Sequence, residues 1–218
     1  MKRFYLTSFL KLIMQLPLLL LVYSCSDNTV SEVPYYDQPD FTPVWTSTKE
    51  ADKLHKVSDF KFTDQDMNEV TGAMMEGKIY AVNFFFTSCP GICPSMTRNL
   101  QRFQNAFKTD NDIKLISHSV MPEVDTSEKL KEYEKNFGLI NGMWYLVRGS
   151  TSDIYTIARR SYFAEEKAGY NSDSTEFLHS ENVILIDRHG HIRGIYKGTL
   201  ALDIERMIED VKILKKES

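Results

Sequence analysis

Apolar residues follow one another almost without a break from Ile79 to Phe86, and β-branched and aromatic side chains dominate this run. The pattern predicts a strand that is buried on both faces of a sheet. Pro94 follows shortly afterwards and suits the first turn of a helix. The apolar positions of that helix recur at helical spacing, at Met96, Leu100, Phe103 and Phe107. The pattern therefore predicts a central strand that leads directly into an amphipathic helix.

The rest of the pattern predicts further strands and helices. Short apolar runs predict strands at residues 113–120, 144–147, 183–187 and 192–196, and the last two form a hairpin. Amphipathic spacing predicts helices at residues 127–137, 152–160 and 202–214. Residues 57–63 are expected to form a strand and the first arm of another hairpin. This order of elements is typical of an α/β, thioredoxin-like sandwich, in which helices flank a central mixed sheet.

The N-terminus has the layout of a secretory signal peptide. Lys2 and Arg3 precede a mostly apolar region, and the small residue Ser24 stands before Cys25. In this position Cys25 resembles the lipid-modified first residue of a mature bacterial lipoprotein. The alternative is an uncleaved membrane anchor over residues 4–23, although Lys11, Gln15 and Pro17 interrupt that span. Both interpretations place the protein in the bacterial cell envelope, facing the periplasm or the cell exterior.

These features divide the chain into three parts. We expect a signal peptide at residues 1–24 and a lipid-anchored tether at residues 25–53, which is polar, rich in proline and without periodicity. Residues 54–218 are expected to form the folded domain. Tyr35, Tyr36, Phe41 and Trp45 lie within the tether and are large enough to pack on the domain surface.

Charge excludes one class of partner. The whole chain has a formal net charge of −4, and removal of Lys2, Arg3 and Lys11 with the leader leaves −7. A protein that binds nucleic acid needs a basic face to neutralise phosphates. We therefore expect no nucleic-acid partner.

Candidate chemistry is concentrated at the end of the long apolar strand. Cys89 and Cys93 are separated by three residues and lie where the predicted strand passes into the predicted helix. The free N–H groups and the dipole of a helix N-terminus favour thiolate over thiol. Paired soft anions on a rigid scaffold suit either redox chemistry or a soft metal. A structural disulfide is a third alternative, because the expected compartment is oxidising.

Three segments carry a resemblance to a known family. FFFTSCPGICPSMT, SVMPEVDTSEKLKEYEKNFG and FLHSENVILIDRHGHI resemble the Sco/SenC family of thioredoxin-like copper proteins, from about Leu54 to the C-terminus. The resemblance implies that Cys89, Cys93 and His179 bind copper. It also implies a role in supplying copper to cytochrome c oxidase, or in thiol–disulfide chemistry on its copper-site cysteines. The implied partner is the copper-site subunit of that oxidase.

The chain departs from the family at one position. Members usually have Asp-Pro-x-x-Asp after the second strand, whereas this chain has Met121-Pro122-Glu123-Val124-Asp125. The first carboxylate is lost and the second is kept. If that acidic pair orders the metal loop or meets a partner in the family, those roles are in doubt here.

Three functional classes fit the dithiol. A metallochaperone and a thiol–disulfide oxidoreductase would use the same two sulfurs. Thioredoxin-type oxidoreductases carry a cis-proline that faces the dithiol, but this chain has no proline after Pro122. A peroxiredoxin-like peroxidase is least favoured, because no proline lies between Pro43 and Pro90 at the position its motif requires. We therefore predict a copper-binding metallochaperone rather than an enzyme, with the oxidoreductase as the alternative.

The remaining histidines and methionines have plainer interpretations. His118 lies among apolar neighbours in a predicted strand and is expected to be buried with its polar atoms satisfied. His189 and His191 flank a hairpin glycine and are expected to be solvated. Met74, Met75 and Met96 are expected to fill the core.

Overall fold

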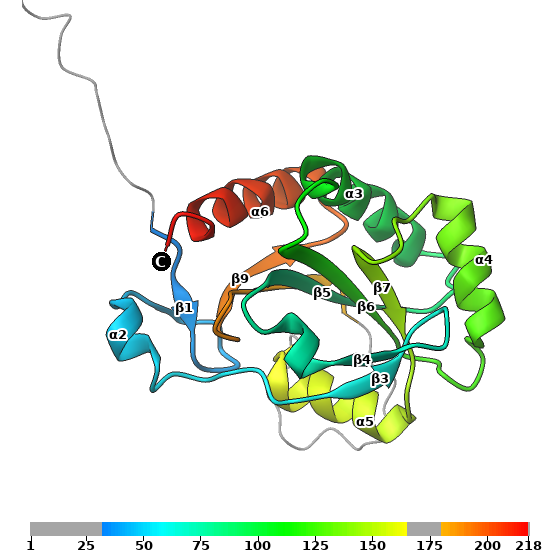
Figure 1. Cartoon of the computed structure of the whole chain (residues 1–218), viewed down its shortest axis with the longest axis horizontal. Coiled ribbons are helices and arrows are strands. Elements are labelled where there is room, and N and C mark those ends of the chain that lie inside the picture. The colour runs from blue at the N-terminus through cyan, green and yellow to red at the C-terminus, as the bar shows by residue number, and fades with distance from the viewer. Residues whose placement is uncertain (1–31, 165–179, 218) are drawn as a thin grey trace, which may run out of the picture. The chain divides into compact units, whose positions relative to one another are not determined.

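The computed structural model describes residues 32–164 and 180–217. Its centre is a five-stranded sheet in the order β7-β6-β5-β8-β9 (Figure 1). β5, β6 and β7 are parallel, β8 is antiparallel to β5, and β9 is antiparallel to β8. The strands are β5 (Ile79–Phe85), β6 (Ile113–Ser119), β7 (Trp144–Val147), β8 (Asn182–Ile186) and β9 (Ile192–Lys197). The predicted mixed sheet is confirmed.

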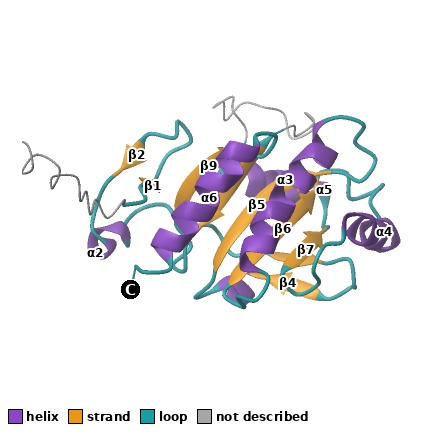
Figure 2. Ribbon diagram, turned by 90° about the horizontal axis from the view of Figure 1, so that it is seen from above, coloured by secondary structure: helices purple, strands orange, loops and turns teal. Residues whose placement is uncertain are grey.

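Helices lie on both faces of this sheet. They are α3 (Ile92–Phe107), α4 (Ser127–Phe137), α5 (Thr151–Thr156), which continues as the π-helical turn η3 (Ile157–Ser161), and α6 (Ala201–Leu214). Figure 2 shows α3 and α6 side by side across one face. An ion pair between Arg102 and Glu205 (3.0 Å) joins the two helices. No helix in the described ranges is long and apolar enough to cross a membrane.

Two hydrophobic cores explain why the central strand is apolar at every position except Asn83. Ile79, Ala81 and Phe85 face the core beneath α3, α4 and α6. Tyr80, Val82 and Phe84 face the opposite core, which is covered by α5 and by a hairpin of β3 (Lys61–Thr63) and β4 (Glu69–Thr71). The short 3₁₀ helix η2 (Gly72–Met75) follows β4. Successive side chains of a strand point to opposite faces, so both sets must be apolar.

The predicted element boundaries are confirmed to within a few residues, and α4 is confirmed at both ends. At its start, the Thr126 hydroxyl accepts a hydrogen bond from the Lys129 N–H (3.4 Å). At its end, Gly138 takes a left-handed conformation (φ 60°) that glycine adopts without steric cost.

The last part of the predicted tether, residues 33–53, contains regular structure. The compact unit already begins at Val33. A small hairpin of β1 (Tyr35–Tyr36) and β2 (Pro43–Val44) is followed by α2 (Thr48–Ala51), and β1 lies beside β9. The side chains of Tyr35 and Ala51 are buried, whereas Trp45 is exposed. The sequence pattern missed this packing because the apolar residues here have no regular spacing.

Candidate dithiol site

Cys89 and Cys93 lie where β5 passes into α3. Cys93 is in the first turn of α3, and Cys89 is in the short loop between the strand and the helix. Both are free cysteines in this structure. Cys93 is buried and Cys89 is partly exposed. The site therefore combines one accessible sulfur with one sulfur packed against the core.

Local hydrogen bonds make the two thiols chemically different. Burial opposes ionisation of Cys89, but hydrogen bonds from the Cys93 thiol and from the backbone N–H groups of Cys93, Gly91 and Ile92 lower the pKa of Cys89 below its ordinary value. Burial, together with the adjacent Cys89 sulfur, raises the pKa of Cys93 to about 12. Cys89 is therefore the more acidic of the two thiols, and Cys93 is the one that keeps its proton more firmly. The direction of the Cys89 shift agrees with the expectation that a helix N-terminus favours ionisation of one thiol, and that expectation remains a prediction.

Tyr133 of α4 lies on the buried side of this pair. Its ring packs against Phe85 with 5.2 Å between ring centroids, and its hydroxyl is hydrogen-bonded to Thr97 Oγ1 (2.7 Å). Burial raises the pKa of Tyr133 to about 12, and the cysteine charges contribute in the same direction. The tyrosine is therefore neutral and does not add a charge to the site. The sequence showed it only as one apolar position of an amphipathic helix.

The carboxylate that the family pattern retains also belongs to this site. Asp125 is completely buried and accepts hydrogen bonds from Thr87, two residues before Cys89. The sequence identified Asp125 as the carboxylate that is kept, but it did not predict the contact with Thr87.

Two predicted site residues lie outside the described residues. These are His179, the expected third copper ligand, and Cys25, the expected lipidation site. Within residues 32–164 and 180–217, no group of three or more His, Cys, Asp or Glu side chains is arranged to hold a metal ion. Both assignments remain predictions.

Two of the other histidines differ from expectation. His118 is buried, but neither ring nitrogen has a hydrogen-bond partner, so the expectation that its polar atoms are satisfied is wrong. His191 is buried and not solvated, and its Nδ1 is hydrogen-bonded to the His55 carbonyl (3.0 Å). His189 is exposed, as expected. Met75 and Met96 are in the core, whereas Met74 is exposed.

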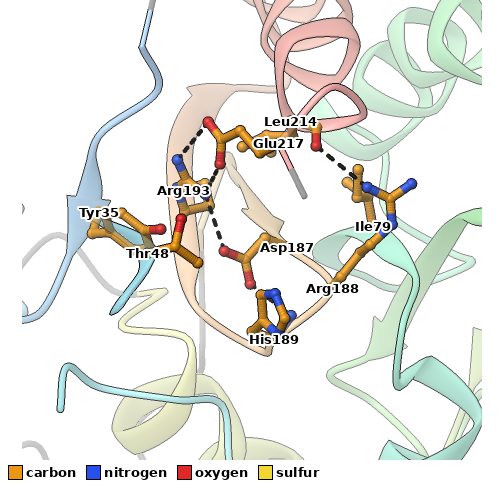
Figure 3. Close-up of a pocket in the computed structure, with 9 residues that line it drawn as sticks. All are labelled: Tyr35, Thr48, Ile79, Asp187, Arg188, His189, Arg193, Leu214 and Glu217. Carbon is orange, nitrogen blue, oxygen red and sulfur yellow. Dashed lines mark hydrogen bonds and ion pairs between the residues drawn. The ribbon is translucent and has the colours of Figure 1, made fainter. Parts of the chain in front are cut away.

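A second cluster of charged side chains lines a pocket at the opposite edge of the sheet (Figure 3). The Arg193 guanidinium donates to Asp187 (3.1 Å) and to both oxygens of Glu217 (2.7 and 3.0 Å). It also donates to the carbonyls of Val33 and Pro34, which uses all five of its N–H donors. This cluster fastens the start of the domain to its end.

The fold and the paired cysteines at the start of a helix define a thioredoxin-like protein. The SCO1/SenC family model matches residues 48–216. The chain therefore belongs to the SCO1/SenC family.

Solved structures agree with this assignment. A SCO1/SenC family lipoprotein from Bacillus anthracis is 28% identical, with a TM-score of 0.65 over 74% of this chain and 96% of that one. BsSco, described as a cytochrome c oxidase assembly protein with a disulfide switch, is 30% identical, with a TM-score of 0.64 over 75% of this chain and 95% of that one. Bradyrhizobium japonicum ScoI with copper bound is 25% identical, with a TM-score of 0.57 over 75% of this chain and 99% of that one.

Proposed function

We propose that this protein is an extracytoplasmic copper-binding protein that delivers copper to, or matures the copper site of, a respiratory cytochrome c oxidase. The observation that carries the proposal is the dithiol of Cys89 and Cys93 on a rigid strand–helix junction. Soft sulfur ligands select Cu(I). Copper in ScoI and the assembly role of BsSco support the same assignment. The proposed partner is the copper-site subunit of the oxidase.

The proposed ligands are Cys89, Cys93 and His179. The donor set fits copper, because two thiolates and an imidazole form a three-coordinate site that suits Cu(I). The accessible Cys89, whose pKa is lowered, provides the first sulfur, and Cys93, whose pKa is raised, must lose its proton to provide the second. Transfer to a partner then needs only exchange of these ligands for those of the recipient.

The test is a competition titration of the reduced full chain against a strong Cu(I) chelator. We expect about one copper per chain, and His179→Ala should weaken binding by more than tenfold while Cys89 and Cys93 still form a disulfide. His189→Ala is the matched control, because His189 is exposed, and it should leave the affinity unchanged. Equal affinities for the wild-type protein and His179→Ala would remove His179 from the site.

A thiol–disulfide oxidoreductase that reduces the oxidase's copper-site cysteines is the second candidate. An accessible thiol with a lowered pKa beside a buried thiol favours it, because the thiolate form is the species that attacks a disulfide. Rescue of oxidase assembly in cells that lack the protein separates the two functions. Full rescue by His179→Ala, despite weakened copper binding, would favour the reductase.

We also propose that the mature chain begins at a lipidated Cys25 and is held at the membrane. The B. anthracis relative described as a lipoprotein supports this assignment. Cys25→Ser should move the protein from the membrane fraction to the soluble extracytoplasmic fraction, or leave it unprocessed. Intact-mass measurement of the wild-type protein checks the same point. An N-terminus that retains residues 1–24 would contradict the proposal.

A further inference from the structure

One buried carboxylate connects the thiol loop to the neighbouring loop of the sheet. The two oxygens of Asp125 accept hydrogen bonds from the Thr87 hydroxyl (2.6 Å) and the Ser119 hydroxyl (2.5 Å). The Thr87 N–H lies 3.2 Å from both oxygens. Asp125 has no exposed surface. Three donors from two separate segments therefore converge on a single side chain.

This contact lies where the backbone stops holding the two segments together. Phe85 and Ser119 are partners at the carboxyl ends of β5 and β6. The Val120 N–H donates to the Phe85 carbonyl (2.9 Å) just beyond that pair. After Phe85, the chain leaves the sheet towards Cys89, and Asp125 holds it through Thr87. Burying a carboxylate costs free energy unless hydrogen bonds compensate for the lost water. The donors of Thr87 and Ser119 provide that compensation here, so we expect this connection to resist rearrangement.

We propose that Asp125 is a positioning residue of the dithiol site, which holds the loop from Thr87 to Cys89 so that the Cys89 sulfur stays at the N–H groups that begin α3. The backbone N–H groups of Gly91, Ile92 and Cys93 hydrogen-bond to that sulfur. These hydrogen bonds require the loop from Thr87 to Cys89 to keep its present conformation. Asp125 thus acts on copper through the arrangement of Cys89, and this part of the inference rests on the proposed function.

The departure at Met121 does not disturb this arrangement. Met121 contributes its backbone alone, since its N–H donates to Ser119 Oγ (3.2 Å) and its carbonyl accepts from the Asp125 N–H (2.9 Å). Its side chain packs against the core on the other face of the sheet. The first carboxylate of the family pattern is therefore dispensable for holding the thiol loop.

Two variants test the proposal, with a control from the same strand. Asp125→Asn keeps the shape of the side chain but removes its charge, and Thr87→Val removes only the hydroxyl donor. Ser117→Ala is the matched control, because Ser117 is also buried on β6, two residues before Ser119, and is hydrogen-bonded to Asn83 (2.6 Å) and Trp144 (2.8 Å). Ser119→Ala replaces Asp125→Asn if the latter does not fold.

The full chain, carrying Cys25→Ser, is measured in three ways: Cu(I) affinity, the pH profile of Cys89 alkylation by iodoacetamide, and the denaturant midpoint. We expect Asp125→Asn and Thr87→Val to weaken copper binding by roughly 10- to 100-fold, the usual cost of losing a partner that orients a metal ligand. The alkylation midpoint should move upwards, towards about 8.5. The double variant should be no weaker than Asp125→Asn alone, because both act through one contact. Ser117→Ala should lower only the denaturant midpoint.

Each alternative has its own result. If Asp125→Asn lowers the denaturant midpoint but leaves copper affinity and the alkylation profile unchanged, Asp125 only stabilises the fold and the proposal is overturned. If the wild-type protein binds no copper but the alkylation midpoints shift as expected, the positioning role stands and the proposed function fails.

Discussion

Replacing either Cys89 or Cys93 with serine is expected to abolish tight copper binding. Serine offers a hard, protonated oxygen, and one thiolate with one imidazole is a poor site for a soft ion. The loss should exceed the roughly 10- to 100-fold expected when an outer-shell partner is removed. Because copper must displace the proton of Cys93, whose pKa is raised to about 12, affinity should weaken as the pH falls.

Comparison of oxidised and reduced protein provides the control for this prediction. A disulfide between Cys89 and Cys93 occupies both sulfurs, so oxidation and copper loading should exclude one another. The competition titration is repeated on both forms, with His191→Ala as a variant that should leave uptake unchanged. Equal copper uptake by the oxidised and reduced forms would show that these cysteines are not the ligand pair.

His118→Phe is expected to stabilise the domain. His118 is surrounded by the rings of Phe62 (5.1 Å), Phe84 (5.2 Å), Phe60 and Tyr162, and both of its nitrogens lack partners. An unsatisfied buried polar group costs about 1–3 kcal/mol, and phenylalanine removes two such atoms at a small cost in extra volume. We expect the free energy of unfolding at pH 7 to rise by about 1–3 kcal/mol, measured by urea denaturation with an unchanged m-value.

The same substitution should remove an acid sensitivity. Burial lowers the pKa of His118 from 6.5 to about 3 in the folded domain. The unfolded chain therefore binds a proton between these values when the folded one does not. The wild-type protein should lose stability as the pH falls through this window, by up to roughly 5 kcal/mol. The His118→Phe variant should lose less stability over the same pH range, and His189→Ala is the control. Parallel curves for wild type and His118→Phe would contradict the prediction.

The predictable parts of the fold are those governed by local periodicity. The strand at residues 144–147 and the helix at residues 127–137 were predicted at both ends, because a short apolar run, amphipathic spacing and a terminal glycine are local signals. The hairpin at residues 35–44 was missed, because Tyr35 and the backbone before it contact Arg193, which is far along the chain.

The histidines show the same division. His118 and His191 differ little in sequence context from many buried or hairpin histidines. Only the packing of the folded chain surrounds His118 with aromatic rings that offer no hydrogen bond. Likewise, only the folded chain brings the His55 carbonyl within hydrogen-bonding distance of His191. Residue type and spacing carry no information about such distant partners.

The sequence by itself determined that this protein has two cysteines at the junction of a buried strand and a helix, because an apolar run, a Cys-x-x-x-Cys spacing and a proline are all local signals. It also determined the family and hence the expected metal. Only the tertiary structure decided that the pKa of Cys89 is lowered while that of Cys93 is raised, and that Asp125 accepts hydrogen bonds from Thr87. These properties depend on burial and on hydrogen bonds between segments that are distant in sequence, and no local pattern encodes them.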